Sequence, residues 1–278
     1  MKKINIMKKS SSMIPYVILI MIGVTFLIPL LWVIVASLDV SATTAINFSN
    51  PLSLDNYKEV ISDVKNRQSF LQSGIISLTQ TSIVLICSML AAYPLSRFEL
   101  KNGQKITMGL LFLTSIPITA VMVPVYQMFI MMKLIDSTMG TIIFLSTAAL
   151  PYGIWMMKNF FDGVPVELEE AAWTDGASAI KCIIKIIIPL MLPGVFTVAM
   201  FTFIGSWGNF FVPFILLQSA NKIPAAVNIY RFFGNHGAVL YGQLAAYSIM
   251  YMMPIFMLYA FAQKYMSQGF SMSGAAKG

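Results

Sequence analysis

Residues 165–194 read PVELEEAAWTDGASAIKCIIKIIIPLMLPG, a short polar interruption in a very apolar chain. Pro165 suits the first position of a helix. The helix dipole favours the carboxylates that follow in the first turn, Glu167, Glu169 and Glu170. Asp175-Gly176 then supplies a residue pair that tolerates a left-handed stop. We therefore predict a short helix, a turn at Gly176, and a second helix that starts near Ala177 and continues into the apolar sequence.

The composition excludes a soluble domain of this length. Of the 278 residues, 58% are hydrophobic and 10% are charged, and the mean hydropathy is +0.77. The net charge of +7 comes from basic residues at the ends of apolar runs, which favours a positive-inside bias over nucleic acid binding. Cys87 and Cys182 lie in different environments and His236 is the one histidine, so neither a disulfide nor a metal site is indicated. The chain is predicted to be a polytopic membrane protein in contact with lipid.

Six apolar segments fit membrane-spanning helices. They lie at about 13–38, 72–95, 106–131, 140–160, 193–217 and 243–261. Pro117 and Pro124 predict bends in the third segment, because prolines free carbonyl groups that neighbouring helices must satisfy. With both termini in the cytoplasm, twelve of the 18 Lys and Arg residues lie on the inner side and six on the outer side. This bias supports the orientation and places residues 165–194 in the cytoplasm.

Two polar segments are expected on the outer side. Residues 39–71 are predicted to be partly helical, and residues 219–242 form a longer loop rich in aromatic side chains. We divide the chain into residues 1–70, with the N-terminal tail, first span and external segment, residues 71–263 as the core transmembrane domain, and residues 264–278 as a cytoplasmic tail.

The chain lacks groups that other mechanisms need. None of its eleven acidic residues lies in the middle of a span, where a buried ionisable group would cost roughly 2.5–3.5 kcal/mol. A carrier driven by protons or sodium usually needs such groups, although backbone carbonyls can also bind an ion. No G-x-x-x-x-G-K-[ST] motif occurs, so any ATP must be bound by a separate subunit. No G-x-S-x-G motif lies near His236, so a Ser/His/Asp catalytic set is not supported either.

The polar stretch has the spacing of a known motif. Its landmarks are Glu170-Ala171-Ala172, Asp175-Gly176-Ala177, Pro189 and Pro193-Gly194. This order resembles the EAA loop of the permease subunits of binding-protein-dependent ABC importers. Without the full motif, an amphipathic connector between two spans would be an equal alternative.

Other stretches are similar to the carbohydrate branch of these permeases, the group that includes the shorter maltose permease subunit. They are residues 55–57 (DNY), residues 91–98 (AAYPLSRF) and the tail at residues 263–278. This branch often carries a Trp-Asn-acidic run in the fifth span. The present chain departs from it and reads Trp207-Gly208-Asn209-Phe210.

The resemblance implies an all-α fold of the type I ABC importer permease class in the cell membrane of a prokaryote, with six transmembrane helices, both termini in the cytoplasm and a coupling helix between spans 4 and 5. The implied partners are a second, related permease, two ATPase subunits that bind ATP and Mg²⁺, and an extracytoplasmic substrate-binding protein that contacts residues 219–242. The resemblance also implies a transport subunit and not an enzyme, with ATP hydrolysis on the partner ATPase and no cofactor on this chain. The residues assigned to coupling are Glu169, Glu170, Ala171, Ala172, Asp175, Gly176 and Ala177.

A substrate pathway is a separate hypothesis. Aromatic faces and amide groups suit sugar rings and hydroxyls, and four such residues are candidates for the cavity wall: Tyr126, Gln127, Trp207 and Asn209. An aromatic residue in a span is more often a packing residue or an interfacial anchor. The predicted function is the import of a carbohydrate, in particular an oligosaccharide, by alternating access. The alternatives are an ABC permease for another solute such as a glycerol phosphate, and a stand-alone secondary carrier or channel.

Overall fold

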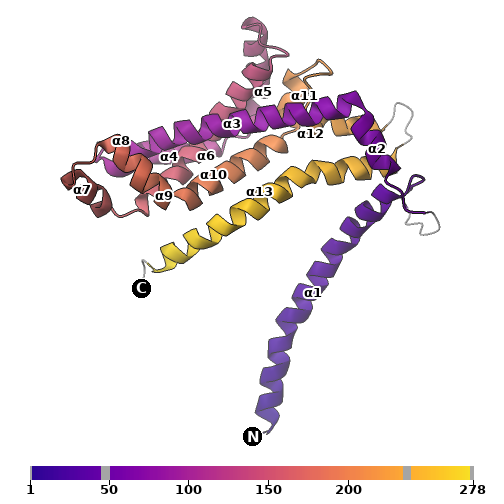
Figure 1. The fold of residues 1–278 in the computed structure, drawn as a ribbon, viewed down its shortest axis with the longest axis horizontal. Helices are drawn as coiled ribbons and strands as arrows, with labels where there is room; N and C mark the ends of the chain where they lie inside the picture. The colour runs from indigo at the N-terminus through magenta and orange to yellow at the C-terminus, as the bar shows by residue number, and fades with distance from the viewer. Residues whose placement is uncertain (1, 45–50, 234–238, 276–278) are drawn as a thin grey trace. The chain divides into compact units, whose positions relative to one another are not determined.

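The computed structural model describes residues 2–44, 51–233 and 239–275, and it describes side chains between residues 13 and 263 of these ranges. All regular secondary structure in these ranges is helical (Figure 1). His236, which we predicted to lie in an external loop, is outside the described residues.

The chain forms two compact units. The first contains Met1–Val64 and Ile229–Met252, and the second contains Lys65–Asn228 and Met253–Gly278. The helices of the first unit are α1 (Lys2–Leu38), α2 (Asp55–Ser62), the 3-10 helix η2 (Ile229–Phe233) and the first part of α13 (Tyr241–Ala275).

Helix α1 is apolar on all sides. Its segment Met13–Leu38 has a mean hydropathy of 2.9, and its side chains from Met13 to Leu31 are exposed. A helix that is apolar all round needs an apolar environment on every side. The exposed surface of α1 therefore suits lipid or a second membrane protein.

Asn56 and Tyr57 hold the end of α1. The Asn56 side-chain nitrogen donates to the carbonyl oxygens of Ser37 (3.1 Å) and Asp39 (3.0 Å). The Tyr57 hydroxyl donates to the Ser37 hydroxyl (2.8 Å). A Cβ atom at Gly242 would lie 2.5 Å from the Asn56 amide nitrogen, so glycine lets the start of α13 pack here. The sequence at residues 55–57 thus closes the connection between α1 and α2.

The second unit is a bundle of long and broken helices. They are α3 (Val64–Arg97), α4 (Gly103–Thr114), α5 (Ile118–Met131), α6 (Thr138–Asp162), α7 (Glu167–Thr174), α8 (Ala179–Cys182), the π-helix η1 (Ile183–Ile187), α9 (Ile188–Leu190), α10 (Leu192–Trp207), α11 (Phe211–Leu216) and α12 (Ala225–Asn228).

The described residues contain four helices that are long and apolar enough to cross a membrane, and six if each of two bent helix pairs counts as one span. The first bent pair is α4 and α5, which meet at an angle of 89°. The break falls at Pro117, the N-cap of α5, so a predicted bend is confirmed there. Pro124 lies inside α5, which continues past it.

The fifth apolar segment differs from the predicted range 193–217. It consists of residues 179–190 and α10, bent by 74°, and α10 ends at Trp207. Gly208 is the C-cap of α10, and the Asn209 side-chain oxygen accepts a hydrogen bond from the Val212 backbone N–H (3.1 Å) at the start of α11. Phe210 is the N-cap of α11, and the Asn209 amide satisfies one free backbone N–H in the first turn of that helix, so the segment breaks before residue 217.

Two apolar clusters form the core of this unit. The first includes Ala92, Met157, Phe161, Ala172, Cys182 and Ile187, and the second includes Ile76, Met122, Phe129, Ile142, Leu145, Val212 and Leu216. Helices α6 and α10 approach closely beside the first cluster, against which Phe160 packs. A Cβ atom at Gly194 would lie 2.4 Å from Cγ of Phe160, so only glycine fits at this contact.

Candidate functional site

The polar stretch folds as a short helix, a turn and a second helix. Helix α7 begins at Glu167, two residues later than predicted, with Val166 as its N-cap. Its first turn carries the predicted carboxylates Glu167, Glu169 and Glu170. Helix α8 begins at Ala179, where the Ser178 side chain accepts a hydrogen bond from the Lys181 backbone N–H (3.4 Å).

The turn after α7 is left-handed. Gly176 has a φ of +82°, a backbone angle that residues with a Cβ atom rarely adopt. The Ala177 backbone N–H donates to the Ala172 carbonyl (2.9 Å), and this bond closes the end of the helix. The predicted turn at Gly176 is therefore confirmed.

A buried ion pair fixes α7 to the end of α3. The Arg97 side chain is 5% exposed and the Glu169 side chain is 1% exposed, and the guanidinium Nε of Arg97 contacts Oε1 of Glu169. The Tyr93 hydroxyl donates to Oε2 of Glu169 (2.9 Å), and Nη2 of Arg97 donates to the Val164 carbonyl (3.0 Å). Both carboxylate oxygens thus have a donor, which is the condition for keeping a charge buried.

A second, more exposed connection lies beside this pair. The Ser96 hydroxyl on α3 donates to Oδ1 of Asp162 at the end of α6 (2.6 Å), and Lys158 pairs with Oδ2 of Asp162 (2.6 Å). Helices α3 and α6 and the segment that carries α7 are therefore joined by polar contacts as well as by the first apolar cluster.

The residues predicted to couple to an ATPase fall into two groups that differ in burial. The side chains of Glu169 and Ala172 face the interior, and Ala177 is half-buried. Glu170, Ala171, Asp175 and Gly176 are exposed. Two large apolar side chains on the same helix, Leu168 and Trp173, are also exposed. We call these six exposed residues the α7 surface. The coupling role of the seven residues named from the sequence stays a prediction.

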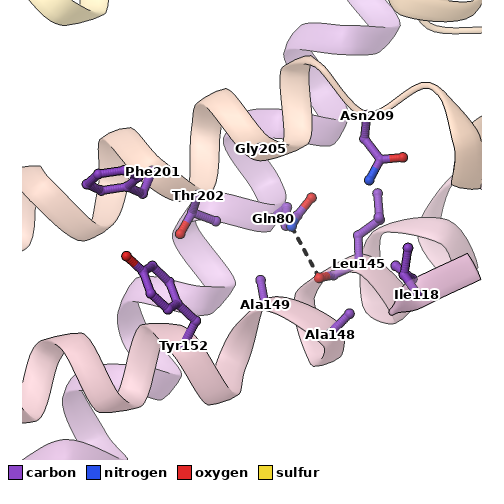
Figure 2. Close-up of a pocket in the computed structure, with 10 residues that line it drawn as sticks. All are labelled: Gln80, Ile118, Leu145, Ala148, Ala149, Tyr152, Phe201, Thr202, Gly205 and Asn209. Carbon is purple, nitrogen blue, oxygen red and sulfur yellow. Dashed lines mark hydrogen bonds between the residues drawn. The ribbon is translucent and has the colours of Figure 1, made fainter. Parts of the chain in front are cut away.

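A cavity of about 310 Å³ lies within the second unit (Figure 2). Its wall is formed by α3, α5, α6, α10 and the break after α10. The lining residues are Gln80, Ile118, Leu145, Ala148, Ala149, Tyr152, Phe201, Thr202, Gly205 and Asn209. None of these lining residues carries a charged side chain. A largely apolar cavity with a few polar groups is the usual form of a small-molecule site.

All four predicted pathway residues lie in the described part of the chain. Of these four, only Asn209 lines this cavity. Trp207 is buried, and its ring stacks on Phe203 with the ring centroids 5.6 Å apart. Tyr126 is half-buried and packs against the second apolar cluster, whereas Gln127 is exposed. The structure thus does not bring the four side chains together around this cavity.

Three polar residues of these sites were not singled out from the sequence. Tyr93 and Arg97 lie in the quoted stretch at residues 91–98, but nothing in a single sequence pairs them with Glu169. Gln80 offered a clearer signal, because a polar amide in the middle of a span needs a hydrogen-bond partner on a neighbouring helix. Among the described residues, no group of three or more His, Cys, Asp or Glu side chains is placed to hold a metal.

The fold and these sites define a class of protein: a helical membrane protein with four to six apolar helices long enough to span a bilayer, a short polar helix and a small cavity between helices. Residues 84–271, more than half of the chain, match the family described as "binding-protein-dependent transport system inner membrane component". The chain belongs to this family, and the resemblance that the EAA-like spacing predicted is confirmed at that level. Members of this family are membrane components of transport systems.

Two permease sequences and one solved structure resemble most of the chain. It is 30% identical over 203 residues to the sulfoquinovosyl glycerol transport system permease protein of Agrobacterium fabrum, covering 72% of this chain and 70% of the relative. It is 29% identical to the trehalose/maltose transport system permease protein of Thermococcus litoralis, covering 93% and 94%. A chain of a bacterial ABC transporter that imports the acidic polysaccharide alginate has the same fold, with a TM-score of 0.80 at 21% identity, covering 92% of this chain and 96% of that one.

Proposed function

We propose that this chain is one permease subunit of an ATP-driven importer that moves a carbohydrate, in particular an oligosaccharide, across the cell membrane of a prokaryote by alternating access. Membership of the family and the sugar transport permeases among the relatives support the class. The four to six apolar helices support a position in the membrane with several spans. We place both termini and α7 in the cytoplasm, following the distribution of Lys and Arg.

The observation that carries the coupling proposal is the form of α7. A helix of eight residues is too short to be stable alone, yet this one is clamped to α3 through the buried pair of Arg97 and Glu169. Its opposite side, the α7 surface, exposes Leu168 and Trp173 next to carboxylates. Such a surface suits docking into a cleft of an ATPase, and the clamp would make α3 follow any movement of α7.

The remaining partners follow from the same proposal. Two ATPase subunits would bind ATP and Mg²⁺, so this chain would need no site for either. A second permease subunit and lipid would cover the exposed apolar surface of α1. An extracytoplasmic binding protein would deliver the substrate to the side that carries residues 219–242. Asn209, on the wall of the cavity, remains our candidate for a substrate contact.

The test is reconstitution of the complex into liposomes after its recovery from native membranes in mild detergent. We expect an ATPase, a second permease and a binding protein to co-purify with this chain. Uptake of labelled oligosaccharides should require ATP on the ATPase side and binding protein on the other side. Transport by this chain alone without ATP would overturn the proposal and favour a secondary carrier. ATP-dependent uptake of glycerol phosphate in place of sugars would overturn the substrate class only.

A substitution in the turn tests the α7 surface. Gly176→Val should leave membrane insertion intact but reduce recovery of the ATPase at least several-fold, because a β-branched residue resists a φ of +82°. A Cβ atom at Gly176 would meet no atom within 4 Å, so the effect would come from the backbone and not from a clash. Gly109→Val is the control, since that helical glycine on α4 is equally open and has no positive φ. Recovery of the ATPase at the wild-type yield from Gly176→Val would count against the docking role.

A further inference from the structure

Four lysine side chains carry unpaired charge at the end of the second unit that carries α7. All four are exposed, and none of their ammonium groups makes an ion pair within the described residues. Two further basic side chains at this end, Arg97 and Lys158, are paired with carboxylates. The four unpaired residues, which we call the lysine surface, are Lys101, Lys105, Lys181 and Lys185.

The chain path places the lysine surface on both sides of α7. The connection from α3 to α4 starts beside α7, because the last residue of α3, Arg97, pairs with that helix. Lys101 lies in this connection, and Lys105 lies in the first turn of α4. Lys181 lies in α8 and Lys185 in η1, the elements that follow the turn after α7. Figure 1 shows α7 and α8 together at one end of the second unit, the end that we place in the cytoplasm.

Exposed apolar side chains lie directly beside these lysines in the sequence. Helix α4 has no buried residue, and Ile106, Met108 and Phe112 on it are exposed. Ile180 and Ile184, next to the other two lysines, are exposed as well. Both segments belong to the bent helix pairs that are apolar enough to cross a membrane. A lysine at the end of such a segment extends its alkyl chain along apolar surface and places its ammonium group among lipid headgroups.

The charges at this end of the unit are separated by sign. Helix α7 and its C-cap carry exposed carboxylates at Glu167, Glu170 and Asp175, whereas α8 and η1 carry exposed lysines. In residues 98–105 the one carboxylate, Glu99, faces two lysines in number and leaves a net positive charge. A protein cleft that complements the acidic α7 surface would not complement the lysine surface in the same way. A partner for the lysines needs negative charge joined to an apolar body.

We propose that the lysine surface binds the headgroups of anionic phospholipids in the cytoplasmic leaflet, with their acyl chains along the exposed apolar side chains of α4, α8 and η1. The anionic lipids of that leaflet attract basic residues next to membrane spans. The inference goes beyond the proposed import function, because it does not depend on the transported solute. Since α8 follows α7 after one turn, bound lipid would also fix the position of α7 relative to the membrane surface.

The experiment measures lipid binding by native mass spectrometry of the complex that this chain forms, recovered in mild detergent. The probe is phosphatidylglycerol, and phosphatidylcholine is the comparison, because it has the same phosphate but no net charge. Two double variants, Lys101→Gln with Lys105→Gln and Lys181→Gln with Lys185→Gln, each remove one half of the surface. Each should weaken phosphatidylglycerol binding at least tenfold, because one lysine near an anionic membrane surface contributes a factor of roughly five. The corresponding Lys→Arg doubles should keep the binding.

The matched control removes two lysines that already have carboxylate partners. Lys58→Gln with Lys158→Gln lowers the charge by the same amount, but Lys58 pairs with Asp55 and Lys158 pairs with Asp162. This double variant should bind phosphatidylglycerol like the wild type. Yield and size-exclusion profile, compared with those of the Lys→Arg doubles, check that each variant is folded.

Three results would overturn the proposal. Equal phosphatidylglycerol binding by the wild type and both Lys→Gln doubles would remove the role of the lysines, and equal binding of phosphatidylcholine would remove the selection for an anion. Displacement of the lipid by millimolar inorganic phosphate would identify a site for a free anion. Loss of the ATPase from the Lys→Gln doubles with unchanged lipid binding would assign the lysines to the ATPase. Failure of ATP-dependent uptake would overturn the import function alone, because the lipid measurement needs no transport.

Discussion

Two ion pairs in the second unit hold loop segments against neighbouring helices, and the two pairs differ in how far their side chains are buried. Arg97 and Glu169 are 5% and 1% exposed, and they fix α7. Lys222 and Asp136 are 37% and 23% exposed, and they fix the segment after α11. Figure 1 shows α7 and α11 at opposite ends of this unit. The first pair depends on mutual neutralisation in an interior without solvent, whereas the second depends on several hydrogen bonds that water can partly replace.

This difference predicts how each connection responds to change. Removing one partner of a buried pair leaves an uncompensated charge, which costs far more than the pair contributes. Removing one partner of a partly exposed pair costs little, because solvent screens the charge that remains. The α7 connection should therefore be rigid but intolerant of substitution, and the connection after α11 should be tolerant but sensitive to pH.

The largest expected effect follows from loss of the buried carboxylate. Glu169→Ala should lower the free energy of unfolding by about 3–5 kcal/mol, because Arg97 would stay buried without its partner. SDS titration of the purified protein in mixed micelles measures this change. Glu170→Ala is the control one residue away, since that side chain is exposed, and it should change stability little.

A double substitution tests whether the cost comes from the isolated charge. Arg97→Met combined with Glu169→Leu replaces the pair with apolar side chains and should recover most of the stability. A double variant as unstable as Glu169→Ala would mean that the helix connection depends on the shape or hydrogen bonds of the pair, and the comparison between the two pairs would fail.

A smaller effect is expected from one hydrogen bond to the carboxylate of the same pair. Tyr93→Phe removes the hydroxyl that donates to Oε2 of Glu169 and keeps the ring, which packs edge to face on Phe161 with centroids 5.7 Å apart. A hydrogen bond to a charged group contributes about 1.5–3 kcal/mol, so the loss should fall in that range. The same titration measures it, and a loss as large as that of Glu169→Ala would show that the ring had moved.

The sequence predicts the local structure of both regions better than their contacts. Residues 165–194 specify a helix with an acidic first turn and a glycine stop, and the structure contains both, because these features depend on neighbours in the sequence. Pro117 likewise predicts its bend. The partner of Glu169 lies 72 residues earlier in the chain, and a single sequence holds no information on which helices pack together. The break at Asn209 was missed because the apolar composition continues on both sides of it.

The same limit applies to the cavity. The sequence pointed to Asn209, which lines it, and also to Trp207, which is buried against Phe203. Both are plausible sugar contacts by residue type. Their side chains point in different directions at the end of α10, and the sequence does not fix those directions. Gln80 also lines the cavity, and its side-chain nitrogen donates to the carbonyl of Leu145, 65 residues later in the chain, a contact that the sequence does not fix.

The smallest effect concerns Asp136 and changes with pH. Its carboxylate accepts from the Ser219 hydroxyl (2.5 Å), the backbone N–H groups of Gln218 (2.9 Å) and Ser219 (3.0 Å), and Lys222 (3.0 Å). The bond from the Ser219 hydroxyl and then that from its N–H hold the pKa of Asp136 well below its usual range. An acid whose pKa is lower in the folded state stabilises the fold above its unfolded pKa, about 3.9 for Asp, and this contribution is lost as the pH falls through the folded value.

Hydrogen exchange of the amides of Gln218 and Ser219 measures this connection. In the wild type, protection should be constant from pH 7 to about pH 4 and should decrease below it, with the intrinsic exchange rate corrected for pH. Asp136→Asn should lower protection at pH 7 by about 1 kcal/mol or less, because the site is partly exposed, and should remove the decrease below pH 4. Asp55→Asn is the control, since the contact with Lys58 lowers the pKa of Asp55 too, but on the surface of the first unit. An acid-induced decrease that persists in Asp136→Asn would assign the pH response to another carboxylate, and the contrast between the two ion pairs would then rest on burial alone.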